Sequence, residues 1–106
     1  MLVVDGSEHL MRLREMYPNA EMHAITPYPE IAENEALAVL DVHWHILDWR
    51  RDRLPFAEEM FDRIISEFAI EYAYEPYDTL MVLNRALKET GTLYTCYTNV
   101  RYHRVL

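Results

Sequence analysis

The histidines and the single cysteine are the residues from which chemistry can first be inferred. His43 and His45 are two positions apart in a predicted strand, so both side chains project from one face and could bind a metal ion. Zinc sites need three or four ligands, and no third ligand stands at a recognisable spacing, so the sequence predicts no metal site. His103 could serve as a general base because imidazole titrates near neutral pH; a terminal tail without a catalytic role is the alternative. His23 is predicted to be a sheet histidine, and Cys96 a core thiol without a histidine partner.

Length and composition exclude several classes of partner. The 106 residues predict one domain, residues 1–106, able to bury roughly two-thirds of its unfolded surface. The formal net charge of −8 argues against nucleic acid, which needs a basic surface. No apolar run approaches the ~20 residues of a membrane span and no signal peptide is visible, so no membrane partner is predicted. A lone cysteine cannot form an internal disulfide, which favours a reducing, cytoplasmic location.

The first half of the chain predicts three strands and two helices. Short apolar runs rich in β-prone residues predict the strands, and apolar residues at helical spacing predict the helices. Ser7 is the predicted N-cap of the first helix. The predicted strands are residues 2–4, 22–26 and 42–47, and the predicted helices are residues 8–16 and 30–40.

The second half predicts a strand, a crossover helix and another strand, which form one parallel unit. The sequence LPF at residues 54–56 reads as a rigid turn because proline fixes its own φ. A buried strand follows at residues 61–66, and a helix at residues 76–87 has leucines along one face. Gly91 is predicted to stop the helical segment, and residues 92–98 form the last predicted strand.

This order of elements predicts an α/β fold. Right-handed crossovers place helices on both faces of a Rossmann-like, doubly wound, mostly parallel five-stranded sheet in the order 3-2-1-4-5. Ligands of such sheets bind at the carboxyl ends of the strands, where the strand order reverses. We therefore expect a ligand over residues 5–8 and Thr26.

The motifs of the second half resemble those of class I S-adenosylmethionine-dependent methyltransferases. An acidic residue precedes LPF at residues 54–56, Phe61 and Asp62 precede two aliphatic residues, and a helix, a glycine and a strand follow. Residues 99–106 are similar to the segment after the fifth strand in methyltransferase domains found beside sugar-transfer enzymes. The resemblance implies S-adenosylmethionine as cofactor and a small or sugar-like methyl acceptor. It also implies that residues 1–106 lack the family's usual final strands.

The loop after the first strand is where the resemblance places the methionyl part of the cofactor. The family has two or three glycines there, so that the backbone approaches the ligand at a helix N-terminus. Asp5, Gly6 and Ser7 would form this cradle, but only Gly6 matches a family glycine. Glu8 adds a side chain and a negative charge near the ligand's carboxylate. An ordinary strand-to-helix turn is the alternative.

Thr26 stands where the family carries an acidic residue that binds both ribose hydroxyls. A hydroxyl makes one neutral hydrogen bond in place of two charge-assisted ones. Hydrogen bonds to charged groups contribute roughly 1.5–3 kcal/mol, against about 1 kcal/mol for neutral ones. The exchange therefore predicts cofactor binding weakened by roughly ten- to a hundred-fold.

Three further residues complete the site that the resemblance implies. Asp48 would meet the adenine amino group, and Trp49 would flank the adenine ring. The alternative for Asp48 is a loop carboxylate paired with Arg50 or Arg51. Glu67 would line the rim of the pocket, and no catalytic residue is assigned.

The last predicted strand, from Thr92 to Thr98, would be an unprotected sheet edge rich in tyrosine and threonine. Unpaired edges promote aggregation unless they are covered. A homodimer that pairs these edges would cover them, and so would packing against another domain. Two function classes follow: a methyltransferase with impaired cofactor binding, and a catalytically inactive binding or dimerisation module.

Overall fold

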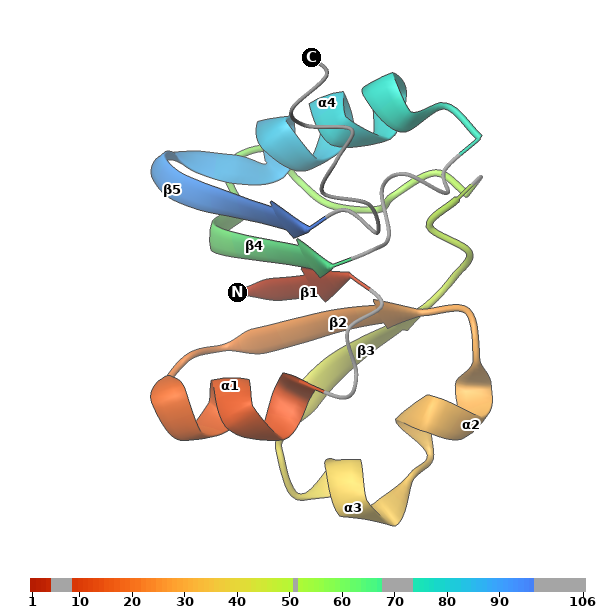
Figure 1. The fold of residues 1–106 in the computed structure, drawn as a ribbon, viewed down its shortest axis with the longest axis vertical. Coiled ribbons are helices and arrows are strands. Elements are labelled where there is room, and N and C mark those ends of the chain that lie inside the picture. The colour runs from red at the N-terminus through yellow and green to blue at the C-terminus, as the bar shows by residue number, and fades with distance from the viewer. Residues whose placement is uncertain (5–8, 51, 68–73, 97–106) are drawn as a thin grey trace.

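Five strands form one parallel sheet in the spatial order β3-β2-β1-β4-β5, which confirms the predicted order (Figure 1). The computed structural model describes residues 1–4, 9–50, 52–67 and 74–96. Each neighbouring pair of strands runs parallel. The strands are β1 (Leu2–Val4), β2 (Met22–Thr26), β3 (Val42–Ile46), β4 (Phe61–Glu67) and β5 (Leu87–Cys96).

Helices cover both faces of this sheet, as predicted. Side chains alternate between the faces of a strand, so Leu2 and Val3 of β1 point in opposite directions. Leu2 packs in the same buried cluster as Leu83 of α4 (Pro76–Ala86), whereas Val3 packs with Leu10 of α1 (Leu10–Met16). The helices are α1 (Leu10–Met16), α2 (Pro29–Ala32), α3 (Glu35–Ala38) and α4 (Pro76–Ala86). Within the described ranges, none is long and apolar enough to cross a membrane.

The prediction of one helix over residues 30–40 was wrong, because the segment is split into α2 and α3. Asn34 lies at the break with extended backbone angles, and its side-chain oxygen accepts a hydrogen bond from the backbone N of Ala36 at 2.8 Å. An asparagine side chain that bonds locally in this way favours a helix start over a helix interior. Asn34 therefore caps a second helix.

The first helix begins later than predicted. α1 starts at Leu10 rather than at residue 8, and its N-cap is His9, which makes no side-chain capping bond. Ser7, the predicted cap, lies outside the described residues. The third strand likewise ends at Ile46, one residue earlier than predicted.

Gly91 does not stop the helix. α4 ends at Ala86 and β5 begins directly at Leu87, so Gly91 lies inside the strand. β5 advances from Leu87 to Thr92 while β4 advances only from Phe61 to Arg63, which marks a bulge. A Cβ on Gly91 would lie 2.7 Å from Leu87 Cδ1 and 2.9 Å from the carbonyl oxygen of Asp62. The glycine is required by this close approach of two strands.

Arg14 ties the starts of two strands together. Its guanidinium donates to the carbonyl oxygens of Ala20 at 2.8 Å, Leu40 at 3.0 Å and Asp41 at 3.2 Å. Ala20 lies two residues before β2, and Asp41 lies directly before β3. One side chain of α1 therefore fixes how β2 and β3 begin.

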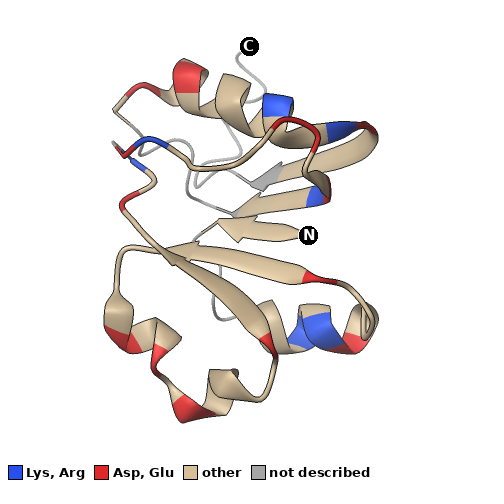
Figure 2. Ribbon diagram, turned by 180° about the vertical axis from the view of Figure 1, so that it is seen from behind, with Lys and Arg blue, Asp and Glu red and all other residues tan. Residues whose placement is uncertain are grey.

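Charge is distributed unevenly over the fold. Residues 26–49 contain acidic residues but neither lysine nor arginine. Figure 2 shows red but no blue on α2 and α3, whereas blue lies on α1 and on the loop before β4. This acidic flank offers no basic surface to a phosphate backbone.

Candidate cofactor site

The carboxyl ends of β1, β2 and β4 meet at the edge where a ligand is expected. Val4 pairs with Ile25 on one side and with Ser66 on the other. The arrowheads in Figure 1 point to the side on which the first turn of α4 begins. Asp5, Gly6 and Ser7, as well as Glu8, lie outside the described residues, so their cradle stays a prediction.

Thr26 ends β2 at this edge and is only 1% exposed. Its Oγ1 accepts a hydrogen bond from the backbone N of Tyr28 at 3.2 Å, which closes the connector after β2. The hydroxyl therefore has a local structural role that the sequence did not indicate. Its predicted contact with a ribose stays a prediction.

Asp48 is paired with Arg50, the alternative that the sequence left open. Arg50 Nε lies 2.8 Å from Oδ1, and Arg50 Nη2 lies 3.0 Å from Oδ2, so the guanidinium contacts both carboxylate oxygens. The backbone N of Arg50 also donates to Oδ1, at 3.1 Å. Hydrogen bonding to this carboxylate raises the pKa of the Arg50 guanidinium. An adenine amino group would have to compete with these bonds.

A cavity of about 410 Å³ lies between the segment after β3 and the start of α4. Trp49, 4% exposed, contributes to its wall and also belongs to the core beside Leu83. The cavity lies within the size range of small-molecule sites. A backbone hydrogen bond from Tyr74 N to Arg50 O at 2.9 Å joins its two sides. Other lining residues are Arg53, Asp78, Thr79 and Val82.

Sequence reasoning missed the α4 side of this cavity. Pro76 is the first residue of α4, and the helix that follows β4 must begin at the carboxyl edge. That rule could have placed Tyr74 and Asp78 near the site. Glu67 is the last residue of β4, so its backbone lies at the same edge.

Ser66 is a second residue that the sequence did not single out. It is 1% exposed, and its Oγ has no hydrogen-bond partner among the described residues. Buried hydroxyls are nearly always paired, so this one marks a place where a polar ligand group would gain a partner. Its only sequence signal is its position, at the end of an apolar run and opposite Val4.

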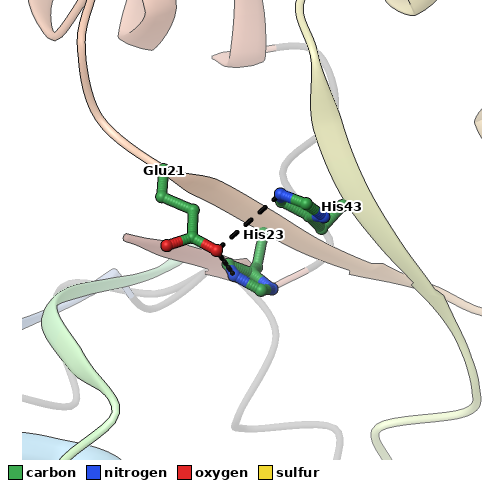
Figure 3. Close-up of side chains that lie close together, drawn as sticks. All are labelled: Glu21, His23 and His43. Atoms are coloured by element: carbon green, nitrogen blue, oxygen red, sulfur yellow. Dashed lines mark hydrogen bonds and ion pairs between the residues drawn. The ribbon is translucent and has the colours of Figure 1, made fainter.

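A separate polar cluster lies near the amino ends of β2 and β3 (Figure 3). His23 stacks on His43 with ring centroids 4.8 Å apart and on His45 with centroids 5.3 Å apart. Glu21 Oε1 lies 3.4 Å from His23 Nε2 and 3.8 Å from His43 Nε2. Burial is the main cause that lowers the pKa of His23 and of His45, which favours the neutral form of both rings. His23 is a sheet histidine, as predicted.

The sequence search for a third ligand failed because it followed spacing along one strand. Glu21 and His23 come from β2 and the residue before it, whereas His43 lies on β3. The predicted strand order already placed these strands side by side. Pairing His23 with His43 would have revealed the cluster.

The family model of the methyltransferase domain matches residues 6–95. The chain belongs to the methyltransferase domain family. The resemblance drawn from the motifs of the second half is thereby confirmed. Comparison with curated proteins finds none that matches this methyltransferase domain.

Two solved structures share the fold of this methyltransferase domain. One is from the complex between the Haloferax volcanii Trm112 methyltransferase activator and a protein named as a methyltransferase, with 27% identity and a TM-score of 0.69. The match covers 89% of the domain and 43% of that chain. The other, named as a methyltransferase from an antibiotic biosynthesis pathway of Anabaena variabilis, has 14% identity and a TM-score of 0.64. The match covers 94% of the domain and 40% of that chain, so the domain spans less than half of either neighbour.

Proposed function

We propose that this methyltransferase domain binds S-adenosylmethionine weakly and transfers its methyl group to a small or sugar-like acceptor. The observation that carries the proposal is the cavity of about 410 Å³ beside the carboxyl ends of a sheet ordered β3-β2-β1-β4-β5. Ligands of doubly wound sheets bind at that edge. The family match over residues 6–95 supports the reaction class. The Anabaena neighbour, named for an antibiotic pathway, supports a small acceptor.

The described residues fit this cofactor only in part. Ser66 Oγ, which has no partner among the described residues, offers one polar contact at the carboxyl edge of the sheet. Thr26 Oγ1, by contrast, already accepts a bond from Tyr28 N, and both carboxylate oxygens of Asp48 are held by Arg50. S-adenosylmethionine carries a reactive sulfonium, so the protein contributes mainly by positioning. Poorly matched contacts at the ribose and the adenine therefore weaken both binding and turnover.

A second candidate is a binding or dimerisation module that keeps the fold without the activity. Two observations favour it: the internal pairing of Asp48, and the position of β5 at the end of the strand order. Tyr94 of this edge strand is 50% exposed. We propose that the edge from Thr92 to Thr98 pairs with a second copy. We further propose that the domain is cytoplasmic and that it binds neither nucleic acid nor membranes.

Titration calorimetry with S-adenosylmethionine and its demethylated product separates the two candidates. Weak binding, with a dissociation constant near millimolar or about −4 kcal/mol, is the expected result. Micromolar binding would contradict the predicted weakening. No heat at any concentration, in protein shown to be folded by circular dichroism, would leave the module as the function.

Light scattering tests the edge-paired dimer. Thr92 is exposed on β5, and a lysine there should block strand pairing, since edge lysines act as a safeguard against it. We expect a dimer for the unaltered domain and a monomer for Thr92→Lys. Asn84→Lys, on the exposed face of α4, adds the same charge away from the edge and should stay dimeric. If the unaltered domain is strictly monomeric, the edge-paired dimer is ruled out.

A further inference from the structure

We propose that Glu21, His23 and His43 form a binding site for a divalent transition-metal ion, with zinc as the best match. The ligand atoms of the three side chains lie within 4.8 Å of one another. Figure 3 shows the carboxylate of Glu21 facing both imidazole rings; His23 and His43 lie on the neighbouring strands β2 and β3, and Glu21 directly precedes β2. The site is at the opposite end of the strands from the cofactor edge and does not depend on the proposed function.

The spacing of the ligand atoms suits one tetrahedral ion. Bonds of about 2.0–2.1 Å to zinc separate neighbouring ligand atoms by roughly 3.3 Å. Glu21 Oε1 lies 3.4 Å from His23 Nε2 and 3.8 Å from His43 Nε2. Side-chain rotations that bring the three ligand atoms, which lie within 4.8 Å of one another, to this spacing would place all of them on one ion. The Glu21 and His43 side chains, 74% and 58% exposed, are free to make them.

His45 supplies the outer contact that a zinc-bound histidine needs. A metal-binding imidazole donates its other N–H to a neighbouring acceptor, which fixes its tautomer and orientation. His23 Nδ1 lies 3.0 Å from His45 Nε2. With a metal on Nε2, His23 would donate this bond from Nδ1 to His45. Without a metal, the bond can reverse, and His23 Nε2 then donates to Glu21 at 3.4 Å.

Packing holds the central ring in place before any ion arrives. Phe61 meets the His23 ring edge-on with centroids 5.3 Å apart, and Phe56 meets the His45 ring in the same way at 5.0 Å. Phe56 and Phe61 also contact each other edge-on, at 5.1 Å. Preorganised ligands lose less freedom on binding, so this framework favours the metal complex.

The starts of the strands are equally well fixed. Arg14 bonds to the carbonyl oxygen of Ala20, directly before Glu21, and to that of Asp41, two residues before His43. The ligands from β2 and β3 are therefore held in register by a side chain on the other face of the sheet. Asp62 and Lys88 line a cavity of about 170 Å³ that also includes Glu21 and His23, and their charges offset each other.

The types of ligand select among metals. Magnesium and calcium prefer sites made of oxygen atoms. Two imidazoles and one carboxylate favour zinc and its first-row neighbours, and neutral rings are the forms that bind. Three protein ligands leave one position for water, as in zinc sites that are open to solvent.

Calorimetric titration of the untagged, EDTA-treated domain with zinc chloride near neutral pH tests the site. We expect one ion per chain, and a tetrahedral d–d absorption band when cobalt replaces zinc. Glu21→Gln and His43→Gln change exposed side chains and should fold, and each should weaken zinc binding by roughly a hundred-fold. His45→Gln, which removes only the outer contact, should weaken it by roughly ten-fold. Glu33→Gln removes the same charge at the C-cap of α2 and should leave zinc binding unchanged.

Several results would overturn the site. Absence of binding heat up to millimolar zinc is one. Binding that Glu21→Gln and His43→Gln leave intact would place the ion elsewhere. Equal weakening by Glu33→Gln would show a response to net charge only. A cobalt complex without the tetrahedral band would contradict the proposed coordination. Circular dichroism of each variant confirms that the comparison is made on folded protein.

Discussion

The polar groups at the two ends of the parallel sheet differ in how strongly they are hydrogen-bonded within the protein. At the carboxyl end, Thr26 Oγ1 accepts a bond from Tyr28 N, and Asp48 is held at 2.8 Å and 3.0 Å by Arg50. At the amino end, the contacts between the Glu21 carboxylate and described side chains are long, 3.4 Å to His23 Nε2 and 3.8 Å to His43 Nε2. Short charge-assisted bonds are strong, and long ones are weak.

This difference concerns which groups are available to a ligand. A carboxylate that already has two guanidinium bonds must break them before it can bind adenine. A carboxylate at 3.8 Å from an imidazole loses little when an ion comes between them. At the carboxyl end, Thr26 and Asp48 are therefore already hydrogen-bonded and Ser66 Oγ is the unpaired group among the described residues, whereas the Glu21 carboxylate at the amino end is available to a ligand.

The largest expected effect comes from a substitution in the hydrophobic core that packs on one face of the sheet and supports both of its ends. Leu83 of α4 is fully buried and packs with Ile25 and Trp49. Leu83→Ala should lower the free energy of unfolding by about 2–5 kcal/mol, because it removes apolar contacts and leaves a cavity. Urea denaturation measures this loss.

Met81→Ala, on the exposed side of the same helix, is the matched control and should change stability by less than about 0.5 kcal/mol. Near the denaturation midpoint, Leu83→Ala should weaken ligand binding at both ends together. Loss at one end alone would mean that the ends do not share this core.

The strand order could be predicted from sequence because it depends on local patterns and one handedness rule. Apolar runs such as residues 2–4 and 61–66 mark strands, and right-handed crossovers then order them. The break at Asn34 was missed because the alanine-rich pattern continues past it. The bulge at Gly91 depends on the approach of Asp62, a residue distant in the chain.

The candidate sites were harder to predict than the fold. Asp48 was placed correctly after β3, but its partner among neighbouring arginines depends on how the loop turns. The Glu21 cluster joins residues of two strands, and no spacing along one strand reveals it. Contacts that cross between strands require the register, which the structure supplied.

The second-largest expected effect concerns the close approach of β4 and β5 at the bulge near the amino end of the sheet. Gly91 lies in the bulge of β5, where a Cβ would meet the carbonyl oxygen of Asp62 at 2.9 Å. Gly91→Ala should lower the free energy of unfolding by about 1–3 kcal/mol, the usual cost of overpacking. Thr90→Ala, at an exposed neighbouring position, should change it little.

Thermal denaturation of both variants checks this prediction. Zinc binding by folded Gly91→Ala should match that of the unaltered domain, because the bulge belongs to β4 and β5 and the ligands to β2 and β3. Unchanged stability would show that β5 can shift away from Asp62 at no cost.

A carboxylate at residue 26 would make the carboxyl end more receptive to a ligand. Thr26→Asp introduces the acidic side chain that the resemblance to class I methyltransferases implies at this position, and under the proposed function it should tighten S-adenosylmethionine binding by roughly ten-fold. The free domain should become less stable, since Thr26 is 1% exposed and a buried charge without a partner is costly.

Calorimetry on Thr26→Asp and Thr26→Asn separates charge from shape. The asparagine has the same outline without the charge and should not tighten binding. Equal behaviour of the two variants would show that the ribose is not bound at residue 26.

The smallest expected effect tests whether the Asp48 carboxylate is withheld from the ligand. Arg50→Gln removes both guanidinium bonds to Asp48 and keeps a side chain of moderate length. Cofactor binding should tighten only a few-fold, because the backbone N of Arg50 still donates to Oδ1 at 3.1 Å and Asp48 N still bonds to Asp52 Oδ2 at 2.6 Å. Arg53→Gln, which removes an arginine from the same cavity wall, is the control for a change in charge. Equal tightening in both variants would mean that charge in the cavity, and not the release of Asp48, governs binding. If Arg50→Gln leaves cofactor affinity unchanged and Thr26→Asp raises it, the weak binding results from residue 26 alone and not from the pairing of Asp48.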